Sequence, residues 1–348
     1  MRQRNTVRFL AGALGLASAL AGCSDSTGPQ ELGAEILVIV NSTESSLSLV
    51  PVADTGMVQT IAIPSQSATP VSLAVHGSRA VVPLGLAHAA AVVDLATVSV
   101  ERIVALEQGS GATGAAFEND SIAWVANPGL NTVTRINLNS GDTSSVAVGV
   151  YPQAVVYASG NIWVGNANLV MFAPAGNAWL SVVNPATSQV VDSIGLSGEN
   201  TAAMELGADG NLYVVNSGNF MGGDGSVSVV NPVMRRETDF LADIGEFPGS
   251  VAWVSSSLLV VGSFGDGIME IDPSGPTLTR PGSQGIKPQG AGVSGLAADP
   301  TGAVYALNPT DCVNPGAVNA LQPPGFDIIR TVATGVCPYA IEFTRIEQ

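Results

Sequence analysis

Residues 211–216 read Asn-Leu-Tyr-Val-Val-Asn, and residues 227–232 read Val-Ser-Val-Val-Asn-Pro. Both segments are rich in β-branched or aromatic residues and end at asparagine or Asn-Pro, as strands that run into turns do. The first segment recurs along the chain, in two cases in degenerate form, and its copies end at positions 41, 84, 127, 166, 216, 263 and 308. Successive copies end 39 to 50 residues apart, a spacing typical of repeat architectures.

Each repeat contains three further strand-like segments. One precedes the first segment, as at 152–157, one follows it, as at 227–232, and a weaker one completes the unit, as at 189–196. Seven units of four short strands predict an all-β, seven-bladed β-propeller over residues 35–345. The chain enters at the second strand of a unit and leaves after an extra first strand at 338–343, so we expect its two ends to complete one blade and close the ring.

The two quoted segments resemble the YVTN-type propellers of bacterial surface-layer and periplasmic proteins, and residues 209–214 are also similar to NHL-type propellers. The resemblance covers residues 35–345 and implies the propeller fold, which hosts binding proteins, scaffolds and enzymes. Some lipid-anchored propellers of this general type capture small nutrients, so the resemblance also implies a ligand-binding role.

Two sets of repeated residues are interpreted as structural. An aromatic residue three positions before the strand-end asparagine is expected to pack between blades, at Trp124, Trp163, Tyr213 and Tyr305. The strand-end asparagine itself is expected to satisfy local backbone groups where a strand enters a turn. It occurs at Asn41, Asn127, Asn166, Asn216 and Asn308.

The first 23 residues have the pattern of an export signal. Three arginines precede an uncharged run of 14 residues, 9–22, which is too short to span a bilayer. The run ends in Leu-Ala-Gly followed by Cys23, which resembles the lipobox of bacterial lipoproteins. The resemblance implies a signal peptide at 1–22, a lipidated Cys23 and a tether at 23–34. Ser24 after the cysteine implies the outer membrane, so we expect a lipid-anchored protein of the cell envelope.

The charge balance restricts the partners of this chain. It has 12 Lys+Arg against 28 Asp+Glu, a net charge of −16. Removal of residues 1–22 would take away three arginines and no acid, which makes the net charge −19. We expect no nucleic-acid partner, because a protein that binds nucleic acid needs a basic surface. We expect a monomeric propeller.

Two cysteines remain after Cys23. Cys312 and Cys337 are 25 residues apart and fall in loops that a propeller places on the same face of neighbouring blades. Exported proteins favour disulfides, so we predict that these two residues are bonded and lock the ring beside its closure.

No catalytic motif is found in the sequence. His76 and His88 fall in a turn and a loop, and metalloprotease, nucleophile-elbow, P-loop and dinucleotide-binding patterns do not occur. Four residues near the expected axis could approximate the metal site of a lactonase- or lyase-like propeller: Asn200, Glu205, Asp299 and Glu342. The sequence requires no cofactor and favours binding over catalysis, with an enzyme and an envelope scaffold as the alternatives.

Loop lengths indicate where binding would occur. The loops between second and third strands are longer in blades 4, 5 and 7 than in the others, and these loops share one face. We expect this rim to capture a small ligand or a protein partner. The candidate residues are Tyr151, Asn168, Phe172, Trp179, Asn219, Phe220 and Phe264. Asp224, Asp266 and Asp311 nearby could bind polar groups or Ca²⁺.

Overall fold

The computed structural model describes residues 35–53, 57–220 and 222–346. These residues belong to one compact unit. The predicted signal peptide, Cys23 and the tether lie outside the described residues. Within the described ranges, no helix is long and apolar enough to cross a membrane.

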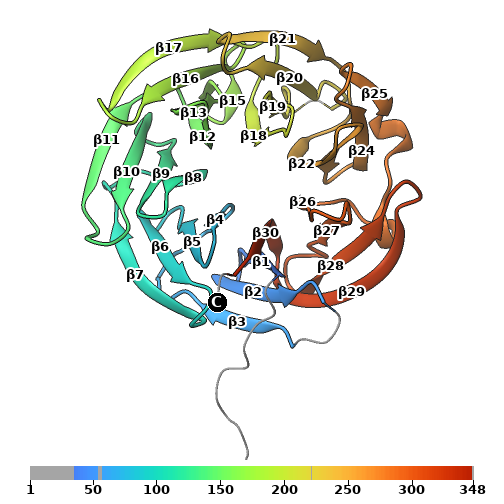
Figure 1. Cartoon of the computed structure of the whole chain (residues 1–348), viewed down its shortest axis with the longest axis horizontal. Helices are drawn as coiled ribbons and strands as arrows, with labels where there is room; N and C mark the ends of the chain where they lie inside the picture. Colours follow the sequence, from blue (N-terminus) through green and yellow to red (C-terminus); the bar gives the residue numbers. More distant parts are fainter. Residues whose placement is uncertain (1–34, 54–56, 221, 347–348) are drawn as a thin grey trace, which may run out of the picture. The chain divides into compact units, whose positions relative to one another are not determined.

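Seven antiparallel four-stranded sheets form the blades of a β-propeller around a central channel (Figure 1). From the channel outward, blade 1 contains β30 (Pro338–Arg345), β1 (Glu35–Asn41), β2 (Ser46–Pro51) and β3 (Gln59–Ala62). Blade 2 contains β4 (Ala74–His76), β5 (Arg79–Pro83), β6 (Ala89–Asp94) and β7 (Ser99–Ala105), and blade 3 contains β8 (Ala115–Asn119), β9 (Ile122–Asn127), β10 (Thr132–Asn137) and β11 (Thr143–Ala147). Blade 4 contains β12 (Pro152–Ala158), β13 (Asn161–Asn166), β16 (Trp179–Asn184) and β17 (Gln189–Gly195).

The remaining blades follow the same order. Blade 5 contains β18 (Thr201–Leu206), β19 (Leu212–Asn216), β20 (Ser226–Asn231) and β21 (Arg236–Leu241), and blade 6 contains β22 (Pro248–Ser255), β23 (Leu258–Ser263), β24 (Gly267–Asp272) and β25 (Thr277–Arg280). Blade 7 contains β26 (Leu296–Ala298), β27 (Val304–Asn308), β28 (Pro315–Gln322) and β29 (Asp327–Val336). Two short 3-10 helices, η1 (Gly282–Gln284) and η2 (Pro288–Gly290), lie in the connection from blade 6 to blade 7. The predicted seven-bladed all-β fold is confirmed.

The two ends of the propeller meet in blade 1, as the sequence predicts. Strand β1 pairs antiparallel with β30, with Leu37 opposite Phe343 and Ile39 opposite Ile341. Cys312 and Cys337 form the predicted disulfide, with Cα atoms 4.3 Å apart. The bond joins a loop of blade 7 to the residue that precedes β30, so it crosses the seam where the ring closes. A disulfide also indicates an oxidising, extracytoplasmic compartment.

The repeated aromatic residues pack between blades, as predicted. Trp124, Trp163 and Tyr213 are fully buried, and Tyr305 is 6% exposed. Trp163 of blade 4, for example, lies in one apolar cluster with Leu212 and Val214 of blade 5. Alternating strands place one apolar set on each face of a sheet, and both faces are buried because each blade is flanked by two others.

The strand-end asparagines are structural, and side-chain hydroxyls are partners that the sequence did not predict. The Asn41 amide donates to Ser46 and Ser48, and the Asn127 amide donates to Thr132 and Thr134, all through side-chain hydroxyls at 2.8–3.0 Å. Asn166 and Asn216 repeat this arrangement with Ser181 and with Ser226 and Ser228. The expected backbone partners occur as well: the Asn308 side chain accepts from the backbone amide of Thr310 at 3.0 Å, and the Asn166 amide also donates to the carbonyl of Trp179 at 3.0 Å. The hydroxyls face the amide because they lie on the next strand of the same sheet, either opposite the asparagine or two residues further along and therefore on the same face.

Candidate functional site

Loops of two kinds emerge on one face of the ring, here called the loop face. They are the loops between second and third strands and the connections from an outer strand to the next blade. The longest strand-to-strand loops on this face are in blades 4, 5 and 7, at residues 167–178, 217–225 and 309–314. The blade 4 loop contains its own hairpin, β14 (Leu169–Val170) and β15 (Ala173–Pro174).

Large apolar side chains are exposed on the loop face in five blades. Among the described loop residues they are Leu86, Val170, Met171, Phe172, Phe220, Phe264 and Val313. A single exposed apolar side chain is normal on a protein surface, whereas several on one rim mark a surface that another molecule covers. Phe172, Phe220 and Phe264 are among the residues that the sequence singles out.

The tip of the β14–β15 hairpin holds two bulky residues in an unfavourable backbone conformation. Met171 has φ 49° and Phe172 has φ 62°. A two-residue hairpin loop with positive φ at both positions strongly prefers Asn-Gly or a similar pair, because larger side chains are strained there. The two side chains are nevertheless 91% and 75% exposed. Neither residue therefore gains burial that would offset the strain, which is a pattern found at functional sites.

Two aromatic contacts extend this surface. The ring of Tyr151 meets the ring of Phe172 edge-on, with centroids 6.0 Å apart. The rings of Phe264 and Tyr339 are also 6.0 Å apart, although they belong to blades 6 and 1. Burial raises the pKa of the Tyr339 hydroxyl. Sequence reasoning missed Tyr339, because nothing in the repeat pattern distinguishes it from other residues at the start of an inner strand.

The other predicted residues hold the loops. Asn168 donates from its amide to the carbonyl of Asn177 at 3.1 Å, which closes the blade 4 loop. Trp179 is half-buried, and a Cβ at Gly149 would lie 2.5 Å from its ring. The ring therefore packs on the backbone of the preceding connection and covers its own blade. The backbone amide of Asn219 donates to Asp224 at 2.8 Å.

The aspartates near the rim also stabilise loops. Asp266 accepts from the backbone amide of Glu246 at 2.6 Å. Asp311 accepts from the backbone amides of Val313 and Asn314, and these hydrogen bonds lower its pKa to about 2. The carboxylates that the sequence offered for Ca²⁺ thus accept hydrogen bonds from backbone amides, those of Asp224 and Asp311 within their own loops and that of Asp266 from the neighbouring connection.

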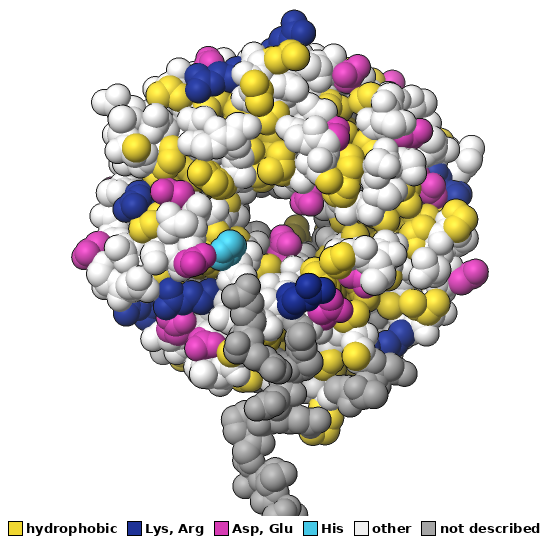
Figure 2. All heavy atoms as spheres, viewed as in Figure 1, with side chains coloured by type: hydrophobic (Ala, Val, Ile, Leu, Met, Phe, Trp, Pro, Cys, Tyr) yellow, Lys and Arg dark blue, Asp and Glu magenta, His cyan; other side chains and the backbone are white. Residues whose placement is uncertain are grey.

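Two glutamates lie on inner strands that border the central channel. Glu205 is on β18 of blade 5, and Glu342 is on β30 of blade 1. Acidic side chains are visible at the opening in Figure 2. Glu205 is half-buried and Glu342 is exposed to the channel, while the surrounding strands still crowd both carboxyl groups with protein atoms. Burial, and then the charge of Glu342, raise the pKa of Glu205 to about 8, while burial raises the pKa of Glu342 to about 7.

The strand register explains why this level of the channel is unfavourable for charge. Glu342 pairs with Val38 and Glu205 pairs with Tyr213, and each partner is three residues before a strand-end asparagine. The corresponding residues of the other five inner strands are small and apolar: Ala74, Ala116, Val156, Ala252 and Ala297. The two carboxyl groups therefore lie in an apolar belt. Their charged forms are unfavourable there because they lose solvation.

Ionisation of this pair is expected to destabilise the fold as pH rises. Both folded-state pKa values lie above the unfolded value of 4.5, so the folded state binds more protons and stability falls between about pH 4.5 and pH 8. The double variant E205Q/E342Q should match the wild type at pH 4 and exceed it at pH 9 by on the order of 1–2 kcal/mol, a value reduced to allow for screening by channel water.

The measurement is the free energy of unfolding by urea at both pH values. A matched control, D239N/D327N, removes two carboxylates from outer strands β21 and β29, where both residues are exposed, and is expected to show no such pH dependence. Equal stability of wild type and E205Q/E342Q at pH 9 would contradict the prediction.

The proposed metal set does not assemble. The Asn200 amide donates to the carbonyl of Gly218 at 3.2 Å. Asp299 accepts from Thr301 and Tyr305 at 2.6 and 2.8 Å; burial opposes its ionisation, but these hydrogen bonds outweigh it and lower its pKa. Within the described ranges, no three His, Cys, Asp or Glu residues are grouped as ligands for a metal ion.

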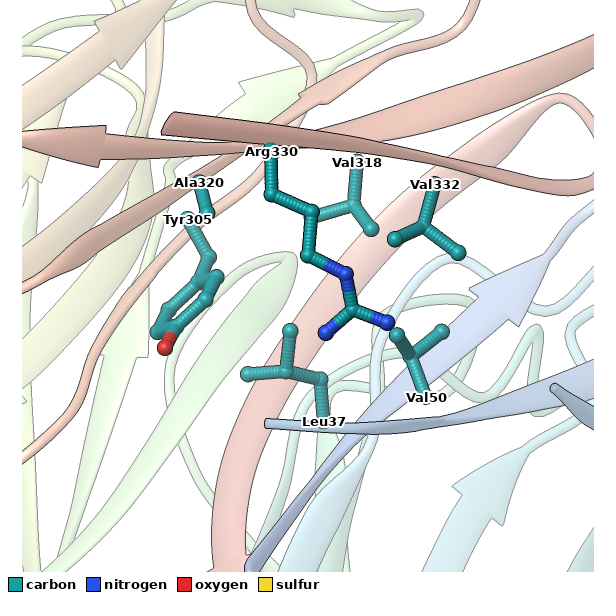
Figure 3. A pocket seen from close by; sticks show the side chains of 7 residues that line it. All are labelled: Leu37, Val50, Tyr305, Val318, Ala320, Arg330 and Val332. Atoms are coloured by element: carbon teal, nitrogen blue, oxygen red, sulfur yellow. The ribbon is translucent and has the colours of Figure 1, made fainter. Parts of the chain in front are cut away.

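A small hollow with room for about one water molecule, partly open to solvent, lies at the seam between blades 7 and 1 (Figure 3). Leu37 and Val50 line it from blade 1, and Tyr305 and Arg330 line it from blade 7. The Arg330 guanidinium donates to the carbonyls of Pro51 and Val52 at 2.8 and 3.2 Å. Ligand pockets measure about 300–1,000 Å³, so this hollow is a structural junction between blades.

On the face opposite the loop face, His76 of β4 meets Asp120 of blade 3. The imidazole Nε2 and the carboxylate Oδ1 are 2.8 Å apart, and the His76 ring stacks on Phe117 at 5.6 Å. The two residues are 44 positions apart in sequence, so only the ring arrangement brings them together. Both side chains are at least half exposed, as expected for His76.

Comparison with known proteins supports the fold. No protein-family model matches the chain, and no curated protein sequence is significantly similar to it. Among solved structures, the hydrazine synthase of Kuenenia stuttgartiensis aligns with a TM-score of 0.63 and 16% identity over 80% of this chain and 90% of that one.

Two other solved structures align over most of the chain. A chain of a nidogen/laminin complex has a TM-score of 0.56 and 9% identity over 90% of this chain and 100% of its own. The computationally designed Ika8 protein has a TM-score of 0.57 and 16% identity over 80% of this chain and 78% of its own. At these identities, the similarity defines the class, a seven-bladed β-propeller, and no particular function.

Proposed function

We propose that this protein is an extracytoplasmic, lipid-anchored propeller that binds a protein partner through its loop face. The observation that carries the proposal is the hairpin tip at Met171 and Phe172, where two strained and exposed apolar residues occupy positions that favour Asn-Gly. Strain without burial is retained where the side chains serve a contact outside the chain. Methionine and phenylalanine are suited to such contacts, because they supply adaptable or large apolar area.

A protein partner fits this surface better than a small molecule does. The exposed apolar residues are distributed over loops of blades 2, 4, 5, 6 and 7, as in a broad contact surface. A small ligand instead needs a concave site that encloses most of its area. The hollow at the blade 7–1 seam is too small for that role and is occupied by Arg330.

The double variant M171N/F172G tests this proposal, because it separates folding from binding. Asn-Gly removes the strain of the tip, so stability should rise by about 0.5–2 kcal/mol. At the same time, the variant should lose cross-linking to the partner. The measurement uses a photo-reactive phenylalanine analogue at Phe264, cross-linking in cells that make this protein, and quantitative mass spectrometry of the products.

A variant with exposed residues changed away from the loop face, V190S/V191S on β17, serves as the control and should keep the wild-type cross-links. Equal protein cross-links from M171N/F172G and from the wild type would argue against the proposal. Specific labelling of a small molecule, with no protein cross-link, would favour capture of a small ligand instead.

The anchor is the second part of the proposal. An arginine-rich start, an apolar run and Leu-Ala-Gly-Cys23 occur in the order found in bacterial lipoproteins, and the disulfide agrees with an exported protein. We also propose that the repeats are related to YVTN-type propellers. Metabolic labelling with palmitate should mark the wild type and not the variant C23S, whose signal-peptide cleavage should also be impaired. Equal labelling of both would contradict lipidation at Cys23.

A further inference from the structure

We propose that the partner of the loop face is a basic protein segment in which cationic and apolar side chains alternate. The inference rests on the proposed function, because it assigns a chemistry to the partner of that same surface. It follows from the charges of the loop face, from the way its carboxylates are used, and from the position of one of them between two loops that carry exposed phenylalanines.

The loop face is strongly acidic. Its described loop residues include one lysine, Lys287, and eight carboxylates: Glu44, Glu107, Glu199, Asp224, Asp243, Glu246, Asp266 and Asp311. Arg280, at the end of β25, is paired with Glu270 on the neighbouring strand. A surface of this kind attracts cationic partners and repels acidic segments and anionic membranes.

Seven of these eight carboxylates fall into two groups, and the eighth, Glu44, accepts from the hydroxyl of Ser46. Asp224, Asp266 and Asp311 accept hydrogen bonds from backbone amides and hold their loops in place. Glu107, Glu199, Asp243 and Glu246 form no such loop hydrogen bonds within the described part of the chain. Their charges are therefore available to a cation from outside, and a new ion pair would not cost the loops an existing contact.

Glu246 lies between two loops of blades 5 and 6 that each carry an exposed phenylalanine. Its Oε1 is 3.3 Å from the position that a Cβ would take at Gly222, and its Oε2 is 3.3 Å from that position at Gly265. Gly222 belongs to the loop of Phe220, and Gly265 follows Phe264. The two rings are 46% and 48% exposed. The surface thus presents a carboxylate between two loops, each of which carries an exposed aromatic residue.

This arrangement specifies the partner's chemistry. An arginine on the partner can form a bidentate hydrogen-bonded pair with a carboxylate while its planar guanidinium stacks on an aromatic ring. Apolar residues on either side of that arginine would cover the phenylalanines and exclude water. In an extended segment, alternate side chains point the same way, so cationic and apolar residues can each face a complementary part of the rim.

Fluorescence polarisation with three labelled 12-residue peptides tests the inference at 150 mM salt. The first alternates Arg and Leu, the second replaces each Arg by its uncharged isostere citrulline, and the third replaces each Arg by Glu. The arginine peptide is expected to bind the mature wild type with a dissociation constant below about 100 µM. The citrulline and glutamate peptides are expected to bind at least about tenfold more weakly.

Three variants locate the site. E199Q/E246Q should weaken binding of the arginine peptide about fivefold to tenfold. D239N/D327N removes the same charge from outer strands and should change binding less than about twofold, since exposed charges beyond a Debye length are screened. M171N/F172G should also weaken binding, because the hairpin tip contributes apolar contact. Thermal melts of each variant establish that the fold is retained.

Equal effects of E199Q/E246Q and D239N/D327N would overturn the inference, because attraction by net charge alone would then account for binding. Equal binding of arginine and citrulline peptides, or no binding of the arginine peptide at about 1 mM, would overturn it as well. In any of these cases, the proposed function would still be supported if the wild type gives a protein cross-link that M171N/F172G abolishes. If M171N/F172G and the wild type give equal protein cross-links, the result would count against the proposed function itself.

Discussion

A chain that lacks residues 338–348 is expected not to form the closed ring. The deletion removes β30 but keeps Cys337 and therefore the disulfide, so it isolates the effect of the strand. It takes from β1 all of its hydrogen bonds on the channel side. It also removes Ile341 and Ile346 from the apolar clusters on the two sides of blade 1.

The expected loss is comparable with the stability of a typical fold. Each fully buried large apolar side chain contributes about 1.5–3 kcal/mol, and the newly unpaired strand edge adds to the deficit. Native proteins have only about 5–15 kcal/mol of net stability. Thermal and urea unfolding, followed by circular dichroism, should show no cooperative transition for the truncated chain.

Two further measurements make this result specific. A chain that lacks only residues 347–348 should melt like the wild type. A synthetic peptide of residues 338–346 added in excess should restore a cooperative transition, because it binds only the folded state. A truncated chain that melts cooperatively within a few degrees of the wild type would show that blade 1 does not depend on its closing strand.

The second large effect is expected for Trp163→Ala. Trp163 is fully buried and its indole nitrogen donates to the carbonyl of Ala158 at 3.1 Å. The ring packs against Leu212 and Val214 of the next blade, so its removal leaves a cavity between blades. Substitutions of this kind cost about 3–5 kcal/mol, which urea unfolding monitored by circular dichroism can measure.

Trp179→Ala is the matched control. This ring covers the backbone of Gly149 but remains partly exposed, so its removal should cost about half as much or less. A loss for Trp163→Ala no larger than that for Trp179→Ala would contradict the assignment of Trp163 to the packing between blades. In that case, the main contribution of the Trp163 ring to stability would not come from contacts between blades.

The fold was accessible from the sequence because a propeller repeats its local signals. Strand-like segments ending at positions 41 to 308 recur seven times, and each repeat depends mainly on its own strands and on its two neighbours. The chain enters at the second strand of one repeat and leaves after an extra first strand, and this predicted the closure of the ring. The pairing of β1 with β30 confirms it. The disulfide was accessible for the same reason, because the repeat places Cys312 and Cys337 on one face.

The candidate site was harder to predict from the sequence than the fold. Loop lengths identified the loop face, but they did not reveal the positive φ values of Met171 and Phe172, because backbone conformation at a tip depends on how the hairpin closes. Nor did they separate Trp179, which covers its own blade, from Phe172, which is exposed. The hydroxyl partners of the strand-end asparagines were missed because they belong to the next strand.

By itself, the sequence determines the number of blades, the closure of the ring and the acidic character of the chain, because these follow from local periodicity and composition. Only the tertiary structure decides which residues from different blades meet. It brings Glu205 and Glu342 to one apolar level of the channel, and it sets Glu246 between the loops of Phe220 and Phe264. These contacts depend on the curvature of the ring, which no local pattern in the chain encodes.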